Sequence, residues 1–311
     1  MNILLFGGSG YVGRALQSSS LFNESLCSTD ITNSEKTLCD VRKAIPVGLA
    51  PWTPDWIITL AAIHREPGHQ PKEYFETNIH GARNIIDYAD RVGCKNIFFM
   101  SSISPYGPTP GPTDESALPQ PNSTYGISKL AAELILQGWQ KESSGRRLII
   151  CRPGVIFGPN DPGNIGRMIE AIRKGYFFYP GDRRIRKSYA YIEGLLESML
   201  FTMNRSDPLI LYNYVEQETE TLENLCKIIA EEYGCPPPLF SIPLPILMPM
   251  AHLAQKITGG HSPLHPIRVR KAAMPTHIIP KWLIENGFSF KWDFRTALLH
   301  MKAREASSFL S

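Results

Sequence analysis

The sequence predicts an α/β fold in which a doubly wound parallel sheet, with helices on both faces, is joined to a smaller, mainly helical C-terminal substrate lobe. Short apolar runs that suit buried strands alternate with amphipathic helical segments through the first half of the 311 residues. A glycine-rich segment directly follows the first of these runs. Beyond Gly158 the pattern changes, and helical segments predominate.

The glycine-rich segment extends from Gly7 to Gly13, between a strand-like run and a helical segment. In this context Gly7 permits a tight turn, Gly10 lets the backbone approach a pyrophosphate, and Gly13 lets the helix pack against the strand. A glycine turn without a ligand is the alternative interpretation. Asp30 ends a second strand-like run about twenty residues further on, where a carboxylate accepts hydrogen bonds from ribose and repels a 2′-phosphate. The two features together predict a Rossmann-type domain that binds NAD rather than NADP.

Two further strand candidates carry residues that could face the cofactor. The first is 37–41, where Asp40 could lie beside an adenine or could equally be a surface aspartate. The second is the buried run 56–62, which ends in Ala61 and Ala62. These small side chains leave room for close approach of a ligand.

The next segments lead to the presumed site. Apolar positions at helical spacing predict one long amphipathic helix over 72–92, with Asn78 within it. The strand candidate 97–100 is followed by Ser102, at the edge where open α/β sheets bind ligands. Six prolines within 105–121 predict a loop beside this edge.

Tyr125 and Lys129 form the most informative pair in the chain. They are four residues apart at the start of a predicted helix, so both project from one face. A phenol has a pKa of about 10, and an adjacent ammonium and a cationic nicotinamide would both lower it. Lys129 could also hydrogen-bond the nicotinamide ribose, and Ser102 could donate a hydrogen bond to the substrate oxygen. The three residues suit hydride transfer at a carbinol carbon, whereas an exposed helical pair is the alternative interpretation of Tyr125 and Lys129.

The remaining elements define two lobes. Helices are predicted near 164–174, 192–203, 222–233 and 266–274 and from 293 to about 304, and strands at 147–151, 187–191 and 209–214. We expect residues 1–158 to form the NAD-binding domain, with a returning segment near 188–215. Residues 159–187 and 216–311 then form the substrate-binding lobe.

The run 239–257 is apolar over nineteen residues. Pro243, Pro245, Pro249 and His252 argue against a membrane-spanning helix. We expect a buried helix of the second lobe, with contact to a membrane surface as the alternative.

Composition excludes several classes of protein. A hydrophobic content of 43% with 20% charged residues is ordinary for a soluble globular chain, and the net charge of +3 with scattered basic residues does not resemble a nucleic-acid-binding arm. The six cysteines include no C-x-x-C pair, which favours a reducing compartment and predicts no metal site. The N-terminus leads directly into a strand without a secretory signal pattern, so we expect a cytoplasmic protein without a transmembrane segment.

With these residues in place, the chain resembles the extended short-chain dehydrogenases/reductases of the NAD-dependent nucleotide-sugar epimerase/dehydratase family. The resemblance covers essentially the whole length. It implies that Tyr125 is the acid/base, that Lys129 orients the cofactor and tunes the tyrosine, that Ser102 assists, and that Asp30 holds the adenosine ribose. It also implies a homodimer formed through a helix pair that includes 125–140. The implied NAD-binding residues are Gly7, Gly10, Tyr11, Val12, Gly13, Asp30, Asp40, Val41, Leu60, Ala61, Ala62, Asn78, Tyr125 and Lys129.

Departures from the family pattern narrow the reaction. Sugar 4,6-dehydratases of the family carry an Asp-Glu pair directly after the residue equivalent to Ser102, where this chain has Ile103 and Ser104. The members that resemble GDP-fucose synthase use a cysteine at the position of Ser104. Dehydration and combined epimerisation and reduction are therefore disfavoured, which leaves C4 epimerisation or simple reduction of a 4-keto-sugar.

The substrate contacts follow the family less closely. Val155 occupies a position where members often have a substrate-binding asparagine. Asn164, Lys187 and Arg270 lie near positions that the family uses for substrate, and with Ser102 they are the predicted substrate-binding residues. Cations facing a pyrophosphate would make charge-assisted hydrogen bonds, although each could equally be a solvated surface charge.

The sequence therefore predicts an NAD-dependent nucleotide-sugar oxidoreductase, either a C4 epimerase or a 4-keto-sugar reductase, without a nucleic-acid partner. Two alternatives remain open. One is a dehydrogenase or reductase of an apolar, steroid-like alcohol; the cations Lys187 and Arg270 speak against it, because such a substrate has no use for them. The other is a non-catalytic NAD-binding sensor or scaffold, against which the intact Tyr125, Lys129 and Ser102 argue.

Overall fold

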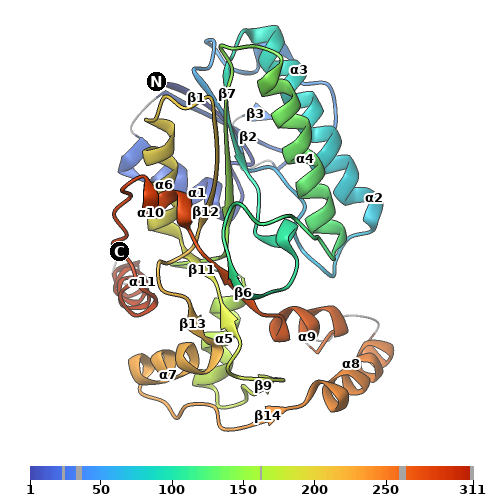
Figure 1. Cartoon of the computed structure of the whole chain (residues 1–311), viewed down its shortest axis with the longest axis vertical. Coiled ribbons are helices and arrows are strands. Elements are labelled where there is room, and N and C mark those ends of the chain that lie inside the picture. The colour runs from blue at the N-terminus through green and yellow to red at the C-terminus, as the bar shows by residue number, and fades with distance from the viewer. Residues whose placement is uncertain (23–24, 33–36, 162, 259–263, 309–311) are drawn as a thin grey trace.

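The centre of the protein is a seven-stranded sheet with the strand order β12-β7-β5-β4-β1-β2-β3 (Figure 1). The computed structural model describes residues 1–22, 25–32, 37–161, 163–258 and 264–308. Every neighbouring pair in this sheet is parallel. The strands are β1 (Asn2–Phe6), β2 (Ser25–Asp30), β3 (Thr37–Leu38), β4 (Trp56–Thr59), β5 (Asn96–Met100), β7 (Arg147–Pro153) and β12 (Leu209–Tyr214).

Helices cover both faces of the sheet (Figure 1). The alternation of strand side chains explains this, because in β1 Ile3 and Leu5 enter one apolar core while Leu4 and Phe6 enter the other. The sheet is therefore doubly wound, which confirms the predicted fold class. One face is covered by α2 (Pro71–Tyr74), α3 (Gly81–Val92) and α4 (Thr124–Lys141), and the other by α1 (Tyr11–Ser18) and α6 (Ile192–Met203).

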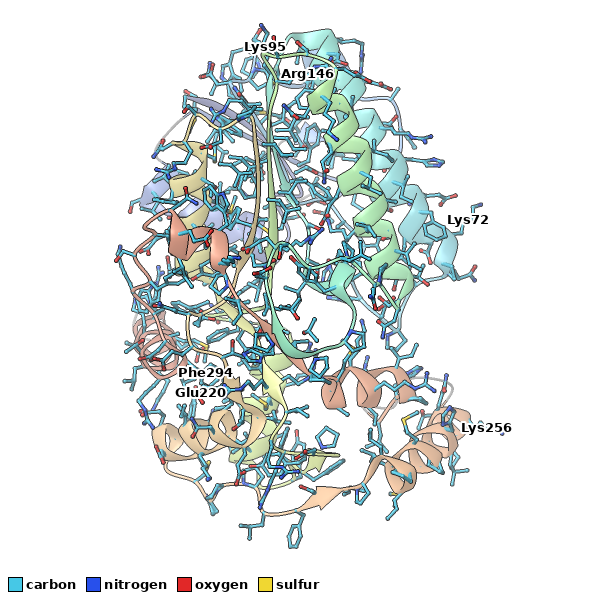
Figure 2. The ribbon with its side chains drawn as sticks, viewed as in Figure 1. Lys72, Lys95, Arg146, Glu220, Lys256 and Phe294 are labelled. Atoms are coloured by element: carbon cyan, nitrogen blue, oxygen red, sulfur yellow. The ribbon has the colours of Figure 1, made fainter. Side chains whose placement is uncertain are left out.

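The lower part of the molecule in Figure 1 is mainly helical, as predicted. Its core is continuous with the α1 and α6 side of the sheet, and the ring of Phe294, labelled in Figure 2, lies 5.4 Å from that of Phe157. The further helices are α5 (Asn164–Arg173), α7 (Leu222–Tyr233), α8 (Leu244–Thr258), α9 (Pro266–Ala273), α10 (Lys281–Glu285) and α11 (Phe294–Ser308).

Four two-stranded ladders connect these helices with the sheet domain. They pair β6 (Thr109–Thr113) with β15 (Thr276–Ile278), β8 (Val155–Phe157) with β11 (Tyr189–Tyr191), β9 (Tyr179–Pro180) with β14 (Ser241–Ile242), and β10 (Arg186–Lys187) with β13 (Glu220–Thr221). Two of the elements predicted from the sequence differ in detail from those in the structure. The proline-rich segment predicted as a loop contains the peripheral strand β6, and the strand predicted over 187–191 is interrupted at Ser188, whose hydroxyl bonds Thr276 instead.

The helix predicted over 72–92 is not regular along its length. A π-helical segment, Phe75–His80, joins α2 to α3. Asn78 lies buried within this segment. Periodicity does not reveal such a segment, because one wide turn leaves the apolar face nearly unchanged, and π-helical turns are frequent at functional sites.

Helix α8 differs from the buried helix that we expected over 239–257. Leu247 and Ala251 are buried against Val269 of α9, but much of the helix surface is exposed. The helix lies at the edge of the molecule, where α9 covers only one of its sides (Figure 1). Among the described residues, we find no helix that combines the length and the apolar character required to cross a membrane.

Candidate active site

The glycine turn after β1 is tightly packed on the chain around it. Gly7 has a φ of +91°, and a Cβ there would lie 2.6 Å from the backbone nitrogen of Ala61. A Cβ on Gly13 would lie 2.4 Å from the carbonyl oxygen of Gly7. Any larger residue at these two positions would displace β4 or α1.

The N-terminus of α1 can receive an anion. The helix begins after Gly10, no side chain caps it, and its first turn has no acidic residue. Its first N–H groups are therefore available, and the helix dipole favours negative charge there. Tyr11 donates a hydrogen bond from its hydroxyl to the carbonyl of Pro159 at 3.2 Å, and Val12 is partly buried in the same turn.

Asp30 lies beside this turn at the end of β2. Its carboxylate accepts hydrogen bonds from the backbone N–H groups of Ser9, at 3.1 Å, and Ile31, at 2.7 Å. These contacts hold the carboxylate next to the glycine turn while leaving it partly exposed. The turn, the uncapped helix and this carboxylate together fit a dinucleotide.

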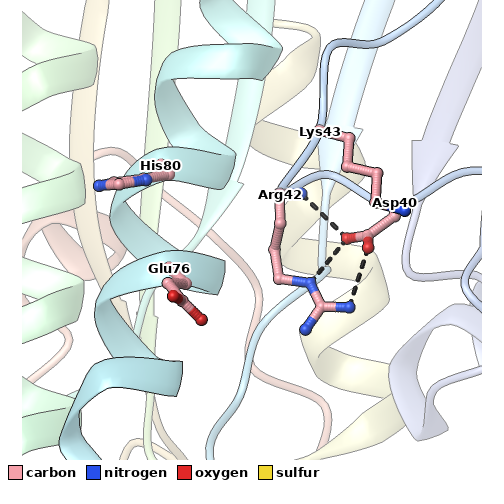
Figure 3. Close-up of a pocket in the computed structure, with 5 residues that line it drawn as sticks. All are labelled: Asp40, Arg42, Lys43, Glu76 and His80. Atoms are coloured by element: carbon pink, nitrogen blue, oxygen red, sulfur yellow. Dashed lines mark hydrogen bonds and ion pairs between the residues drawn. The ribbon is translucent and has the colours of Figure 1, made fainter.

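Asp40 lies at an open pocket formed with Arg42, Lys43, Glu76 and His80 (Figure 3). Arg42 donates to the Asp40 carboxylate from its backbone N–H and from Nε and Nη2, at 3.0, 2.8 and 2.8 Å. These hydrogen bonds hold the pKa of Asp40 below its usual range. The Asp40 carboxylate is therefore bound by Arg42 of its own loop. An adenine at this pocket would meet its rim rather than a free carboxylate.

Val41 and the end of β4 line the same edge of the sheet. Val41 is buried, and its carbonyl accepts a hydrogen bond from Asn84 at 2.8 Å. The backbone N–H groups of Leu60 and Ala61 both donate to the carbonyl of Phe6, at 2.8 and 3.0 Å. Leu60, Ala61 and Ala62 are all partly exposed at this edge.

Asn78 connects three segments of the site. Its amide exchanges hydrogen bonds with the backbone of Ile63, at 3.0 and 3.1 Å, and donates to the hydroxyl of Ser128 at 2.8 Å. Ser128 in turn donates to the carbonyl of Tyr125, also at 2.8 Å. Asn78 therefore ties the loop after β4 to α4.

Tyr125 lies in the first turn of α4, next to Ser102. The hydroxyl of Ser123 caps this helix by accepting from the N–H of Gly126 at 3.1 Å. A Cβ on Gly126 would lie 2.6 Å from the carbonyl oxygen of Ser104, so glycine lets the helix begin against the turn that carries Ser102. The oxygen of Ser102 is held there by Ser104, whose N–H lies at 3.1 Å and whose hydroxyl lies at 3.0 Å.

Burial controls the pKa of the tyrosine. It raises the pKa of Tyr125 to about 12, although the hydrogen bond with Ser102 acts in the opposite direction. Residues of the protein alone therefore do not produce the lowered phenol pKa that the sequence led us to expect. They instead favour the neutral phenol at neutral pH.

Lys129 lies one turn further along α4 and is almost completely buried, with 2% of its surface exposed. Its ammonium donates to the carbonyl of Met100 at 2.6 Å and lies 4.3 Å from the centre of the Phe99 ring. Burial lowers the pKa of Lys129 to about 7, while the charge of Glu133 raises it. The side chain is thus fixed at the carboxyl end of β5.

A buried ion pair, absent from our sequence prediction, supports this end of the sheet. Glu133 accepts from Arg152 at two positions, 3.0 Å from Nε and 2.5 Å from Nη2, and it also accepts from the hydroxyl of Ser101. Both charged side chains are buried. Helical spacing from Lys129 places Glu133 on the same face, but no pattern in the sequence identifies its partner.

Glu66 is a second residue that the sequence did not identify. Its carboxylate accepts from the backbone N–H of Tyr125 at 3.1 Å and pairs with Lys271 of α9 at 2.5 Å. It therefore connects the start of α4 with the helical lobe. Loop residues of this kind have no periodicity from which they could be predicted.

The predicted substrate residues occupy different environments. The ammonium of Lys187 is buried and donates to the carbonyls of Lys271 and Met274, at 3.0 and 2.5 Å. Arg270, the neighbour of Lys271, is exposed on α9, so Lys187 and Arg270 belong to one region. Asn164 is exposed at the start of α5 and accepts from Arg167 at 2.7 Å.

Comparison with known proteins identifies the family. Residues 3–213 match the model of the NAD dependent epimerase/dehydratase family. The chain belongs to this family. A family member from Escherichia coli O157:H7, N-acetyl-alpha-D-glucosaminyl-diphospho-ditrans,octacis-undecaprenol 4-epimerase, is 30% identical over 299 residues, which cover 92% of this chain and 90% of that protein.

Solved structures show the same fold. The UDP-glucose 4-epimerase of Thermotoga maritima with UDP-glucose superimposes with a TM-score of 0.77 at 20% identity and covers all of both chains. The UDP-glucose 4-epimerase of Thermus thermophilus with NAD gives a TM-score of 0.73 at 20% identity, covering 97% of this chain and 99% of that one. The resemblance inferred from the sequence is thus confirmed, and NAD, the predicted cofactor, is the cofactor for which the family is described.

Proposed function

We propose that this family member is an NAD-dependent 4-epimerase of sugars linked through a diphosphate, in which Tyr125 is the acid/base, Lys129 orients the cofactor and Ser102 assists. The observation that carries the proposal is the position of Tyr125. It lies beside Ser102 at the carboxyl edge of the parallel sheet, the edge that also carries the glycine turn suited to a dinucleotide. The E. coli relative, which acts at C4 of a diphosphate-linked sugar, supports the same reaction.

The chain offers a complete set of groups for the cofactor. The glycine turn with Gly7, Gly10 and Gly13 would accept the pyrophosphate at the N-terminus of α1, and Asp30 would accept hydrogen bonds from the adenosine ribose. NAD, when bound, accepts a hydride from C4 of the sugar and returns it. The protein's own residues must therefore orient the sugar and move one proton at its C4 oxygen.

We assign the transfer of that proton to Tyr125. Its oxygen takes the proton of the C4 hydroxyl as the alcohol becomes a ketone, and it gives the proton back when the ketone is reduced. Ser102 holds the C4 oxygen of the sugar by a hydrogen bond. Because burial raises the pKa of Tyr125 to about 12 in the protein alone, proton uptake requires added positive charge near the phenol, which the cationic nicotinamide ring of bound NAD would supply.

Epimerisation also requires the ketone to present its other face before reduction. No acid or base beyond Tyr125 is needed for such a rotation. Ile103 and Ser104 follow Ser102, and neither can act as the acid and base of an elimination of water. These residues therefore support epimerisation over dehydration, and the relative's 4-epimerase activity favours epimerisation over net reduction.

The diphosphate would bind in the region between β10 and α9. Arg270 is exposed there and can make charge-assisted hydrogen bonds to phosphate oxygens. Lys187 is buried against the carbonyl of Lys271, the residue next to Arg270; burial lowers its pKa to about 7, and an approaching diphosphate would favour its charged form. We assign Asn164, which is exposed at the start of α5, to the sugar.

We further propose a homodimer formed through α3 and α4. Ile127 and Leu134 of α4 are exposed apolar side chains, and a helix pair would cover them. Light scattering would test this assignment, and a monomer at micromolar concentration would refute it.

The test of the function is substitution of Tyr125 by Phe, which removes only the hydroxyl. We expect at least a thousandfold loss of epimerisation of UDP-N-acetylglucosamine or of an N-acetylglucosaminyl diphospho-lipid, followed by NMR of the C4 proton, with NADH binding unchanged. Tyr176→Phe, at an exposed tyrosine, is the matched control. Full turnover in Tyr125→Phe would refute the mechanism, and NAD binding by the wild type without epimerisation of either substrate would favour a sensor.

A further inference from the structure

Helix α8 carries an exposed apolar stripe on the side away from the protein. Its members are Ile246, Met250, Leu253 and Ile257, with 57%, 50%, 60% and 75% of their surface exposed. They are four, three and four residues apart, which places them on one face of the helix. The stripe is about 16 Å long at 1.5 Å per residue.

The side of α8 that packs against the protein is formed by residues other than those of the stripe. Leu247 and Ala251 already pack against Val269, with Ile242 and Met248 around them. Leu239 and Phe240, which lead through β14 into α8, add two more side chains that are 72% and 75% exposed. The segment therefore has more apolar surface than its own packing uses.

The segment of sequence that contains the stripe carries basic but no acidic residues. From residue 233 to residue 284 the sequence has no Asp or Glu, although the whole chain contains 29. The same stretch holds Lys256, Arg268, Arg270, Lys271 and Lys281. Lys256 extends outward from α8 in Figure 2, and α9 with its three cations packs directly beside that helix.

We propose that this face, the α8 stripe with Leu239 and Phe240, docks onto an anionic lipid bilayer. An apolar helix face flanked by Lys and Arg, without acids, is the pattern of a helix that lies in the plane of a membrane interface. The apolar side chains enter the acyl boundary while Lys256 and Arg270 pair with lipid phosphates; Lys271 and Lys281 are already paired with Glu66 and Asp114. A second copy of the chain fits this face less well, because a two-fold contact would bring Lys256 and the α9 cations toward their own copies.

The docking face is connected to the candidate active site by direct contacts. α8 packs on α9, Lys271 of α9 pairs with Glu66, and Glu66 accepts from the backbone N–H of Tyr125. The purpose of docking rests on the proposed function. A sugar diphosphate whose carrier is a membrane lipid would have its diphosphate at the headgroup level, beside Arg270.

Vesicle flotation tests the proposal with the intact protein. The vesicles contain phosphatidylcholine alone or with phosphatidylglycerol, and the variants are the double substitution Leu253→Glu with Ile257→Glu and the control Leu299→Glu. Leu299 is an exposed leucine of α11, and Figure 1 shows this helix on the side of the molecule away from α8. We expect the wild type and the control to float with the anionic vesicles, and the double variant to bind about tenfold more weakly.

Several outcomes would overturn the proposal. These are a wild type that does not float, a double variant that floats as well as the wild type, or a double variant whose oligomeric mass falls, which would make the stripe a contact between copies. Flotation requires no turnover, so Tyr125→Phe must float like the wild type. A protein that floats without epimerising any sugar diphosphate refutes only the proposed function, whereas one that epimerises UDP-N-acetylglucosamine without floating refutes only the docking.

Discussion

The buried pair of Glu133 and Arg152 allows a quantitative prediction about how the carboxyl edge of the sheet, with the candidate site, is held in place. Both side chains lie in the core between α4 and β7, and two hydrogen bonds join them. Replacement of Glu133 by Leu removes the carboxylate and leaves the guanidinium of Arg152 without its counter-charge. Within the described part of the chain it then keeps its contacts with Tyr106, whose ring centre lies 4.6 Å away and whose side chain hydrogen-bonds it.

The magnitude follows from this burial. Removal of one partner of a buried pair costs about 3–5 kcal/mol, because the other charge remains desolvated. Replacement of both by apolar residues of similar size costs far less, since the desolvation of both charges is relieved at once. We therefore expect Glu133→Leu and Arg152→Met each to lower the free energy of unfolding by about 3–5 kcal/mol, and the double variant to lose less than either.

A double-mutant cycle compares the wild type, Glu133→Leu, Arg152→Met and the double variant. Urea unfolding of each protein, followed by tryptophan fluorescence and circular dichroism, measures its free energy of unfolding. Glu170→Gln provides a control, because the Glu170 and Lys174 pair is exposed on α5 and its loss should not measurably change stability. A single variant that loses less than about 1 kcal/mol would contradict the argument. Additive losses in the double variant would also contradict it, since they would mean that the two charges do not depend on each other.

Two further predictions concern charge. Burial raises the pKa of Glu216 to about 8, so the folded state holds a proton that the unfolded state releases near pH 4.5. Its contribution to stability is full below pH 4.5 and is lost as the pH rises toward 8. Relative to the wild type, the free energy of unfolding of Glu216→Gln, measured by urea unfolding, should therefore rise by up to about 4 kcal/mol between pH 4.5 and 8. A difference between the two proteins that stays constant with pH would refute this. Asp30→Ala should weaken NADH binding about tenfold and leave NADPH binding unchanged or improved, measured by fluorescence titration, and equal losses for both would show that Asp30 does not read the ribose.

Local patterns predicted most of the fold, because each strand and helix has its own periodicity. The helices 192–203 and 222–233 and the strand 209–214 have the predicted bounds. What could not be predicted arises from contacts between distant segments. Glu66 and Lys271 are more than two hundred residues apart, and the π-helical segment around Asn78 depends on bonds to Ile63 and Ser128.

The candidate site was predicted by residue type but not by electrostatic state. Tyr-x-x-x-Lys and the preceding serine identify the three side chains, and the parallel sheet explains why a serine after β5 meets a tyrosine at the start of α4. Burial depends on the whole core and has no local signature. It is what raises the pKa of Tyr125 and lowers that of Lys129.

These two shifts have a common consequence for the proposed reaction. Burial moves the pKa of the phenol up to about 12 and that of the ammonium down to about 7, so both groups tend toward their neutral forms in the protein alone. A positive charge next to the phenol stabilises phenolate. The protonation state of Tyr125 therefore depends on the charge beside it. A site of this kind remains a weak base until that charge arrives, which restricts proton removal to the complex in which a hydride acceptor is already present.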